Sequence, residues 1–192
     1  MIKTRRLWQI DDSQGVFYFK YPGQLRVASE GSIFVTDREE LLKFSSDGRF
    51  PGNFYRKGRG PGEIGDFFFF DLYRDKLYVY DLIGDKIMKM NLDGGLEEEL
   101  KMKDGPYHQF LGISDNRFVF VRSFYPPFEE RKGALYDVMY SVIFVSSDGR
   151  EFQEINVFRV KTFLAPQAAA GFDPWFAVMN KDRTRLLVNR TR

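Results

Sequence analysis

The sequence predicts an all-β protein, and three observations lead to this prediction. Short segments rich in aromatic and β-branched residues recur along the 192 residues, each flanked by turn residues. Helical patterns are scarce, and the best candidate is a short, proline-flanked stretch around 165–170. Phe occurs 21 times and Tyr 10 times, an aromatic content typical of packed β-sheets. The strands expected from these segments are 32–35, 76–81, 117–121, 141–145 and 185–189.

The expected strands belong to a repeat with a period of somewhat over forty residues. Residues 30–50 align with residues 74–96, so that Asp37 corresponds to Asp81. The spacing between the two copies is 44 residues at this aspartate but 46 residues at the Asp-Gly pair that follows it. The second copy therefore carries a two-residue insertion.

Each copy has the same internal order of four short strands. A first strand and a tight turn precede the aromatic second strand, and a third strand ending in Asp-Gly leads to a fourth. Four short antiparallel strands with a period in the forties are typical of a β-propeller blade. One blade cannot bury both of its faces, so blades pack beside one another. The expected first strands are 25–28, 68–71, 110–113 and 176–179, and the second of them contains most of the run of four phenylalanines.

The sequence holds about three such copies and the beginning of a fourth. The third copy is interrupted by residues 125–137, and the fourth begins at 175. We therefore expect three to four blades in a single propeller domain over 1–192. The expected blades are 24–56, 67–102, 110–158 and 175–192, with 4–19 as a strand segment that closes the ring.

The repeat and one glycine-rich stretch together resemble the six-bladed β-propeller proteins of the NHL-like group. The stretch Gly58–Ile64 (GRGPGEI) is similar to the GxGPGEF link that joins the last strand of one blade to the first strand of the next in that group. Ile64 replaces the usual aromatic residue. With the Asp37 and Asp81 copies, the likeness runs from about residue 16 to the C-terminus and is strongest over 24–96.

The resemblance implies a bacterial, exported, six-bladed propeller, in a group whose members commonly have no assigned function. Six blades need roughly 250 residues or more. We therefore expect a truncated copy, with a compact four-bladed ring as the alternative. The N-terminus has a basic start but no apolar segment of a signal peptide. No run approaches the roughly 18–20 apolar residues of a membrane helix, and a full-length family member would be periplasmic or at the cell surface.

The composition excludes several kinds of chemistry. Cysteine is absent, which removes disulfides, thiolate nucleophiles and cysteine metal sites. The 29 basic and 27 acidic residues leave a net charge of +2, so nucleic acid is not an expected partner. The single histidine, His108, lies in a loop before a first strand, and no serine has a Gly-x-Ser-x-Gly setting. We expect no catalytic residues, no metal and no cofactor.

The glycine-rich stretch has a chemical and a structural interpretation. A phosphate loop would need backbone N–H donors, but Pro61 removes one and no Gly-Lys-Ser/Thr ending follows. Pro61-Gly62 instead fits the centre of a type II turn. Lys57 and Arg59 make the loop basic, which would allow weak anion contact.

Asp37 and Asp81 end equivalent strands and also have two interpretations. Equivalent carboxylates could bind Ca²⁺ or act as acid and base. A repeated Asp is more typical of a local cap that accepts backbone N–H groups of the following turn, and we expect this role. The Asp-Gly pairs at 47–48, 93–94 and 148–149 are expected hairpin turns.

The interruption of the repeat is the best candidate for a binding surface. Insertions in repeat proteins lie in loops on one face, often the binding face. We expect a non-catalytic binding or scaffold module that presents blade-top loops to a protein or carbohydrate partner. The alternative is a propeller lyase or lactonase with a metal held in the central channel. The expected ligand-binding residues are Arg59, Tyr125, Phe128, Tyr136 and Trp175.

Overall fold

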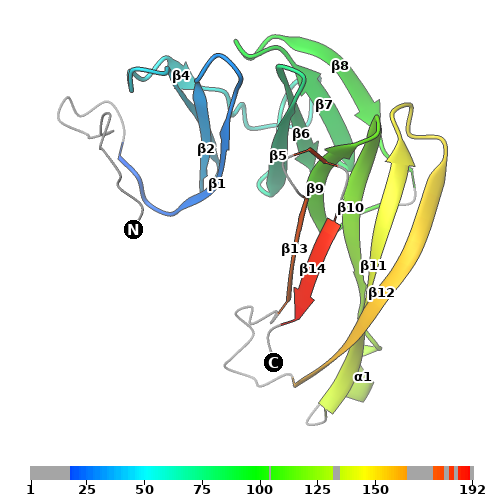
Figure 1. The fold of residues 1–192 in the computed structure, drawn as a ribbon. Helices are drawn as coiled ribbons and strands as arrows, with labels where there is room; N and C mark the ends of the chain where they lie inside the picture. The colour runs from blue at the N-terminus through cyan, green and yellow to red at the C-terminus, as the bar shows by residue number, and fades with distance from the viewer. Residues whose placement is uncertain are drawn as a thin grey trace, which may run out of the picture. The chain divides into compact units, whose positions relative to one another are not determined.

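The computed structural model describes residues 18–163 apart from 104 and 132–134, and then 175–179, 182–183 and 186–190. This part of the chain forms three four-stranded sheets, a two-stranded pair and one four-residue helix (Figure 1). The all-β fold class is therefore confirmed. The chain divides into two compact units, residues 1–99 and 100–192.

The first sheet lies in the first unit and follows the order of the sequence. Its strands are β1 (Pro22–Val27), β2 (Ile33–Asp37), β3 (Glu40–Phe44) and β4 (Gly52–Asn53). Successive strands pair antiparallel. Two residues alone, 38 and 39, connect β2 to β3.

The second sheet repeats this order with one longer connection. It contains β5 (Phe68–Tyr73), β6 (Lys76–Asp81), β7 (Lys86–Met90) and β8 (Leu96–Lys101). Four residues, 82–85, connect β6 to β7. This connection contains the two-residue insertion that the spacing of the repeat predicts.

The first two sheets pack on each other within the first unit. The side-chain carbonyl of Gln24 on β1 accepts a hydrogen bond from Phe70 N on β5 (3.0 Å), and Arg26 Nε donates to Asp71 Oδ1 (2.9 Å). The two first strands thus run side by side in the same direction. Both sheets contribute to one buried cluster, as expected for neighbouring blades. Its fully buried side chains include Phe34, Leu41, Phe70, Leu77, Val79 and Met88.

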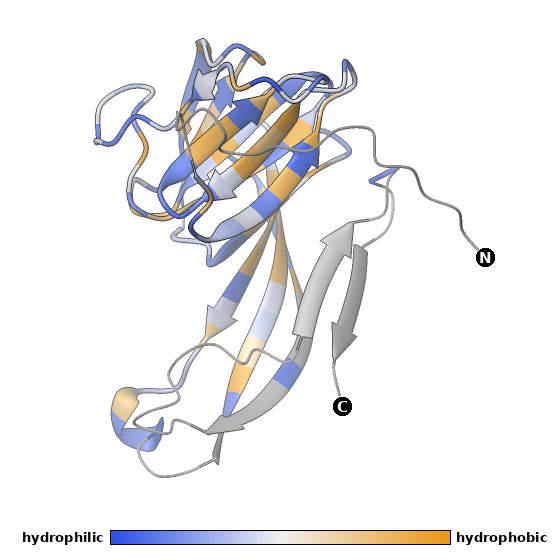
Figure 2. Ribbon diagram, turned by 90° about the vertical axis from the view of Figure 1, so that its left-hand side faces the viewer, coloured by the Kyte–Doolittle hydropathy of each residue, from blue (hydrophilic) through white to orange (hydrophobic). Residues whose placement is uncertain are grey.

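The third sheet lies in the second unit and has much longer strands. It contains β9 (Gln109–Ser114), β10 (Arg117–Phe124), β11 (Leu135–Ser146) and β12 (Phe152–Phe163). β11 and β12 have 12 residues each, where β7 has 5 and β8 has 6. At about 3.3 Å per residue, the extra residues extend the sheet by roughly 20 Å. Figures 1 and 2 show this extension, which continues past the start of β9 to α1 (Phe128–Arg131).

The extension corrects one prediction from the sequence. Residues 125–137 were expected to form a loop, but they contain α1 and the first residues of β11. The physical reason is an alternation of buried residues that begins at Tyr136 and continues through Val138 and Tyr140, with partly exposed residues between them. A period of two specifies a strand with one buried face.

A two-stranded pair follows in the second unit. β13 (Trp175–Met179) pairs antiparallel with β14 (Leu186–Arg190), near the strands expected at 176–179 and 185–189. The helix expected around 165–170 lies outside the described residues, as does almost all of the closing segment 4–19. The single domain and the bounds of its blades stay predictions.

Candidate binding site

The end of the extended third sheet carries three exposed aromatic side chains. Phe124 ends β10, Tyr125 follows it and Phe128 begins α1, and these side chains are 44%, 46% and 54% exposed. Large apolar side chains that are exposed together are typical of an interaction surface. Aromatic residues and arginine are also the types that are enriched at such surfaces.

Arg131 lies between two of these rings. Its guanidinium carbon is 5.7 Å from the ring centroid of Tyr125 and 5.6 Å from that of Phe128. Phe128 and Arg131 are three residues apart in α1, a spacing that places both side chains on one side of the helix. A cation over the face of an aromatic ring is attracted by the ring quadrupole. We call Phe124, Tyr125, Phe128 and Arg131 the aromatic tip.

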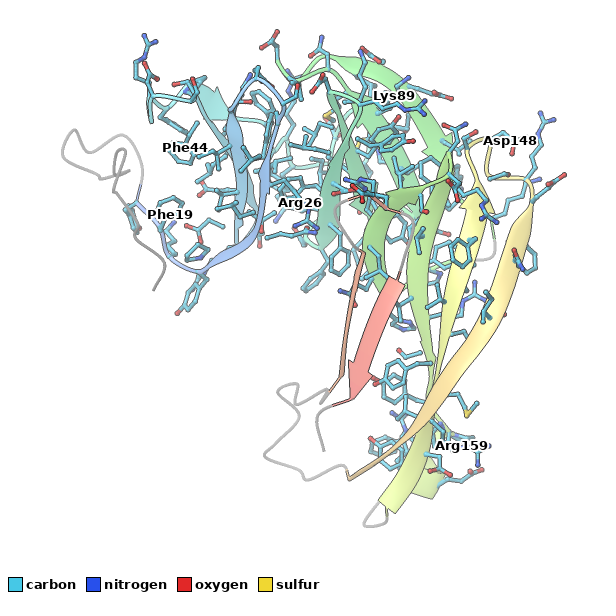
Figure 3. All side chains as sticks on the ribbon, viewed as in Figure 1. Phe19, Arg26, Phe44, Lys89, Asp148 and Arg159 are labelled. Atoms are coloured by element: carbon cyan, nitrogen blue, oxygen red, sulfur yellow. The ribbon has the colours of Figure 1, made fainter. Side chains whose placement is uncertain are left out.

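Two polar atoms near the aromatic tip are buried without a partner. Arg131 Nε and Asp137 Oδ1 form no hydrogen bond within the described part of the chain. Each such group costs about 1–3 kcal/mol. The other carboxylate oxygen of Asp137 lies 3.6 Å from Nη1 of Arg159 on β12. Arg159 is labelled in the extension of the third sheet in Figure 3. Arg131 in the tip therefore keeps an unused donor, and Asp137 on β11 keeps an unused acceptor.

Arg122 connects the tip to the body of the third sheet. Its guanidinium carbon lies 4.9 Å from the ring centroid of Tyr107 and 5.8 Å from that of Phe124. Tyr107 is buried and stacks on Phe120 with a centroid distance of 4.4 Å. Arg122 thereby packs against one ring that is fixed in the core and one ring that is exposed.

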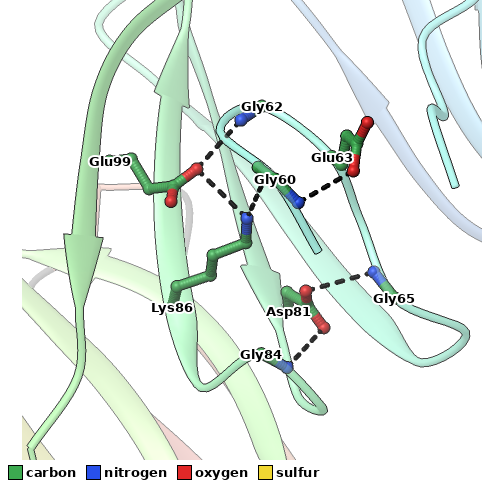
Figure 4. A network of polar contacts seen from close by, with 8 residues as sticks. All are labelled: Gly60, Gly62, Glu63, Gly65, Asp81, Gly84, Lys86 and Glu99. Carbon is green, nitrogen blue, oxygen red and sulfur yellow. Dashed lines mark hydrogen bonds and ion pairs between the residues drawn. The ribbon is translucent and has the colours of Figure 1, made fainter. Parts of the chain in front are cut away.

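Asp81 has the capping role that the sequence predicts. Its Oδ1 accepts hydrogen bonds from Ile83 N and Gly84 N, both at 3.0 Å, in the turn that follows β6. Its Oδ2 accepts a third from Gly65 N at 3.1 Å, in the segment that leads into β5 (Figure 4). The carboxylate is buried and accepts three backbone donors.

Asp37 departs from the predicted cap. It accepts hydrogen bonds from Lys20 N (2.6 Å) and Tyr21 N (2.5 Å), which precede β1 rather than follow β2. The following connection has only two residues before β3 begins. What the two aspartates share is the bond to the segment that leads into the first strand of their own sheet.

The third sheet also bonds the segment before its first strand to its second strand, but here the side chain in the leading segment is the acceptor and the second strand supplies the donor. His108 lies in the segment before β9. Its imidazole Nδ1 accepts a hydrogen bond from Ser123 N (3.1 Å), and its backbone N–H donates to Val121 O (2.9 Å). Burial, and secondly the charge of Arg122, lower the pKa of His108 below its usual 6.5. His108 is therefore hydrogen-bonded within its own sheet, in its neutral form.

The glycine-rich stretch forms the predicted turn. Gly62 has a φ of +72°, and Glu63 N donates to Gly60 O at 3.1 Å, as a type II turn with Pro61 at its second position requires. The N–H groups of Gly60 and Gly62 donate to Glu63 Oε2 (2.8 Å) and Glu99 Oε2 (2.9 Å) (Figure 4). The donors that a phosphate loop would use are thus bound to carboxylates of the protein itself.

Charged side chains fix this turn to the second sheet. Lys86 is buried, donates to Gly60 O (2.8 Å) and pairs with Glu99 (3.1 Å). Lys57 pairs with Asp66 (2.6 Å) and Glu39 (3.4 Å). Arg59 is exposed in the same stretch.

The structure brings together two of the five predicted ligand-binding residues. Tyr125 and Phe128 share the aromatic tip, whereas Tyr136 is only 8% exposed and belongs to the core cluster of the third sheet. Arg59 belongs to the first unit, and the side chain of Trp175 lies outside what the structure describes. The sequence reasoning missed Phe124 and Arg131. The signal for Arg131 was its spacing of three residues from Phe128.

Metal ligands do not cluster in the described part of the chain, where no three His, Asp or Glu side chains lie so that they could hold an ion. The helix of that part is too short to cross a bilayer.

Repeated four-stranded antiparallel sheets, packed face to face with their first strands side by side, define a β-propeller. The model of the family DUF5128, described as a 6-bladed beta-propeller, matches residues 14–165. The chain belongs to this family. This confirms the fold that the sequence resemblance implied.

Several solved structures are similar to this chain. A protein from Bacteroides fragilis described as exported has 18% identity and a TM-score of 0.48, over 77% of this chain and 52% of that one. A protein of unknown function from Bacteroides caccae has 11% identity and a TM-score of 0.44, over 72% and 48%. A streptogramin B lyase has 18% identity and a TM-score of 0.39, over 88% and 68%. The chain spans about half the length of the two Bacteroides structures. No curated protein matches it.

Proposed function

We propose that this protein is a non-catalytic binding module that holds a protein or carbohydrate partner at its aromatic tip. The observation that carries this proposal is the exposure of Phe124, Tyr125 and Phe128 around Arg131. Aromatic rings supply a large contact area, and the guanidinium supplies charge and several donors in a fixed geometry. Arg131 Nε and Asp137 Oδ1 add a donor and an acceptor that a small rearrangement on binding would satisfy.

Four exposed residues of the first unit also support presentation by blade-top loops. Tyr18, Tyr21, Phe67 and Ile83 are more than half exposed, and all four lie where a first strand begins or a second strand ends. Arg38 lies over the ring of Tyr21, with 4.3 Å from its guanidinium carbon to the centroid. The turns at the opposite ends of these sheets are polar. They are formed by residues such as Asp47, Gly48, Arg74, Asp75, Asp93 and Gly94.

The use of the acidic and imidazole groups supports binding over the lyase or lactonase alternative. Such an enzyme needs side chains from several blades that converge on a metal. Asp37, Asp81 and His108 instead each bind backbone N–H groups within their own sheet. The location that goes with this function is the periplasm or cell surface, as the family resemblance implies.

A binding screen tests the proposal. We expect fluorescently labelled protein to bind at least one glycan or protein on arrays of both kinds. The double variant Tyr125→Ala/Phe128→Ala should lose about tenfold or more in affinity for that ligand, because two exposed aromatic contacts of roughly 1 kcal/mol each disappear. Leu96→Ala, which removes an exposed apolar side chain from β8, is the matched control and should bind as the wild type does. Binding that survives the double variant unchanged would refute the tip as the site.

A further inference from the structure

The outer edge of the third sheet is a long strand that no strand in the described part of the chain covers. The strand order is β12-β11-β10-β9, so β12 forms one edge, and it is not paired on its outer side by any described strand. It has 12 residues and no proline. An edge of this kind presents a row of backbone N–H and C=O groups that another extended chain can bind.

The sequence of β12, FQEINVFRVKTF, is complementary to itself when it is read in the opposite direction. Eleven of its residues pair with β11, and Val157 alone is skipped, because Asn156 lies opposite Ser141 and Phe158 lies opposite Tyr140. Phe158 is therefore the central position of the paired strand. An antiparallel second copy centred there would place Glu154 opposite Lys161. The other opposed positions are Phe152 and Phe163, Gln153 and Thr162, Ile155 and Val160, and Asn156 and Arg159.

The skipped residue makes this register possible. Opposed residues of two antiparallel strands must lie on the same face of the sheet. Positions 154 and 161 are seven residues apart, so a regular strand would place them on opposite faces. Their partners on β11 are Ile143 and Asp137, which are six residues apart and share a face. The bulge at Val157 thus restores the alternation that the self-complementary pattern needs.

The charges on β12 favour pairing with a second copy of the strand over repulsion of it. Edge strands that avoid association carry charges that repel a second copy. β12 carries Glu154 in its first half and Arg159 and Lys161 in its second half, so an antiparallel copy meets opposite charges. Glu154 and Arg159 are exposed. Cross-strand pairs of opposite charge and of apolar residues stabilise a sheet.

We infer that two copies of this chain associate through β12, with antiparallel strands centred on Phe158, to form one continuous sheet across the dimer. The two-fold axis gives two Glu154–Lys161 pairs in each dimer. The inference concerns the edge of the third sheet and does not depend on a ligand at the aromatic tip.

Charge reversal tests the dimer by sedimentation of the chain over a concentration series. The wild type should reach twice the monomer mass of 22.6 kDa. Glu154→Lys places like charges opposite each other at two positions and should raise the dissociation constant about tenfold or more. The double variant Glu154→Lys/Lys161→Glu should restore dimerisation. Glu151→Lys makes the same chemical change at an exposed residue outside β12 and should leave the constant unchanged.

Three outcomes would overturn the inference. The first is a wild type that stays monomeric at every concentration. The second is an equal rise of the dissociation constant in Glu154→Lys and Glu151→Lys. The third is a double variant whose dissociation constant stays as high as that of Glu154→Lys. Hydrogen exchange of the wild type keeps the test valid if a variant does not fold. The amides of 152–163 should become more protected as the protein concentration rises, and protection that is independent of concentration would contradict pairing through this edge.

Discussion

Asp81 shows at the level of one residue how the blades hold their loops. The carboxylate is 1% exposed and accepts three backbone hydrogen bonds from two loops. Two glycines surround it closely. A Cβ on Gly65 would lie 2.8 Å from Asp81 Oδ1, and a Cβ on Gly84 would lie 2.5 Å from Oδ2. Both positions require glycine because the carboxylate lies too close to the backbone to leave room for a Cβ.

Removing this carboxylate should destabilise the fold. We predict that Asp81→Ala lowers the free energy of unfolding by about 3 kcal/mol, because three donors in buried loops lose a charged acceptor worth roughly 1.5–3 kcal/mol per bond, with partial replacement by water. Urea denaturation measures the change. Asp93→Ala is the matched control, since its side chain is 91% exposed and its ion pair with Lys43 contributes less than about 1 kcal/mol. Equal losses in the two variants would contradict the role given to Asp81.

His108 should make stability depend on pH. Its folded-state pKa is lowered from 6.5, so the unfolded chain binds the proton more readily. The stabilisation is therefore complete above about pH 6.5 and is lost as the pH falls through the lowered pKa of the folded state. Urea denaturation between pH 7.5 and 5.0 should show this decrease. The ring is partly exposed, so we expect a modest effect.

The variant His108→Gln is the control for this pH dependence. Glutamine has no charge to gain, and its side-chain oxygen can accept the hydrogen bond from Ser123 N. The chain has no other histidine, and carboxyl groups titrate near pH 4 and below. The unfolding free energy of the variant should stay flat where that of the wild type falls. Parallel curves for the two proteins would show that another group is responsible.

At the scale of single elements, the turn at Gly60–Glu63 allows a clean test of backbone conformation. Gly62 has a φ of +72°, and a Cβ there would meet Leu96 Cδ2 at 3.5 Å, an ordinary contact. We predict that Gly62→Ala lowers the free energy of unfolding by about 1–2 kcal/mol, through backbone strain alone. Gly62→Asn should cost less, because asparagine tolerates this conformation. A lower melting temperature for Gly62→Asn than for Gly62→Ala would argue against the turn.

The elements that the sequence predicted are those with a strong local signal. Strands β6 and β10 have alternating aromatic residues between turns, and β2 has aromatic and β-branched residues between turns. Pro61-Gly62 specifies its own turn. The donors to Asp37 could not be predicted, because Lys20 and Tyr21 come to it only through the pairing of β1 with β2. The extension was missed because residues 125–137 interrupt the repeat and insertions of this kind lie in loops, whereas a strand with a buried face begins at Tyr136 within this segment.

At the scale of the whole molecule, the repeat explains the fold and its interruption explains the candidate site. The repeated positions, such as Asp37 and Asp81, are occupied by bonds within their own sheets. The aromatic tip lies where the third copy departs from the repeat, and Tyr125 and Phe128 could be chosen from the sequence for this reason. Their arrangement around Arg131 could not, because it depends on the short helix α1.

The location of the bound partner tests the central claim most directly. Hydrogen exchange of the chain would be measured with and without the glycan or protein selected on the arrays. Binding at the aromatic tip predicts new protection at 122–131, and that protection should be absent in Tyr125→Ala/Phe128→Ala. Protection confined to other segments, such as the glycine-rich stretch 57–66 or the turn 82–85, with 122–131 unchanged, would contradict it.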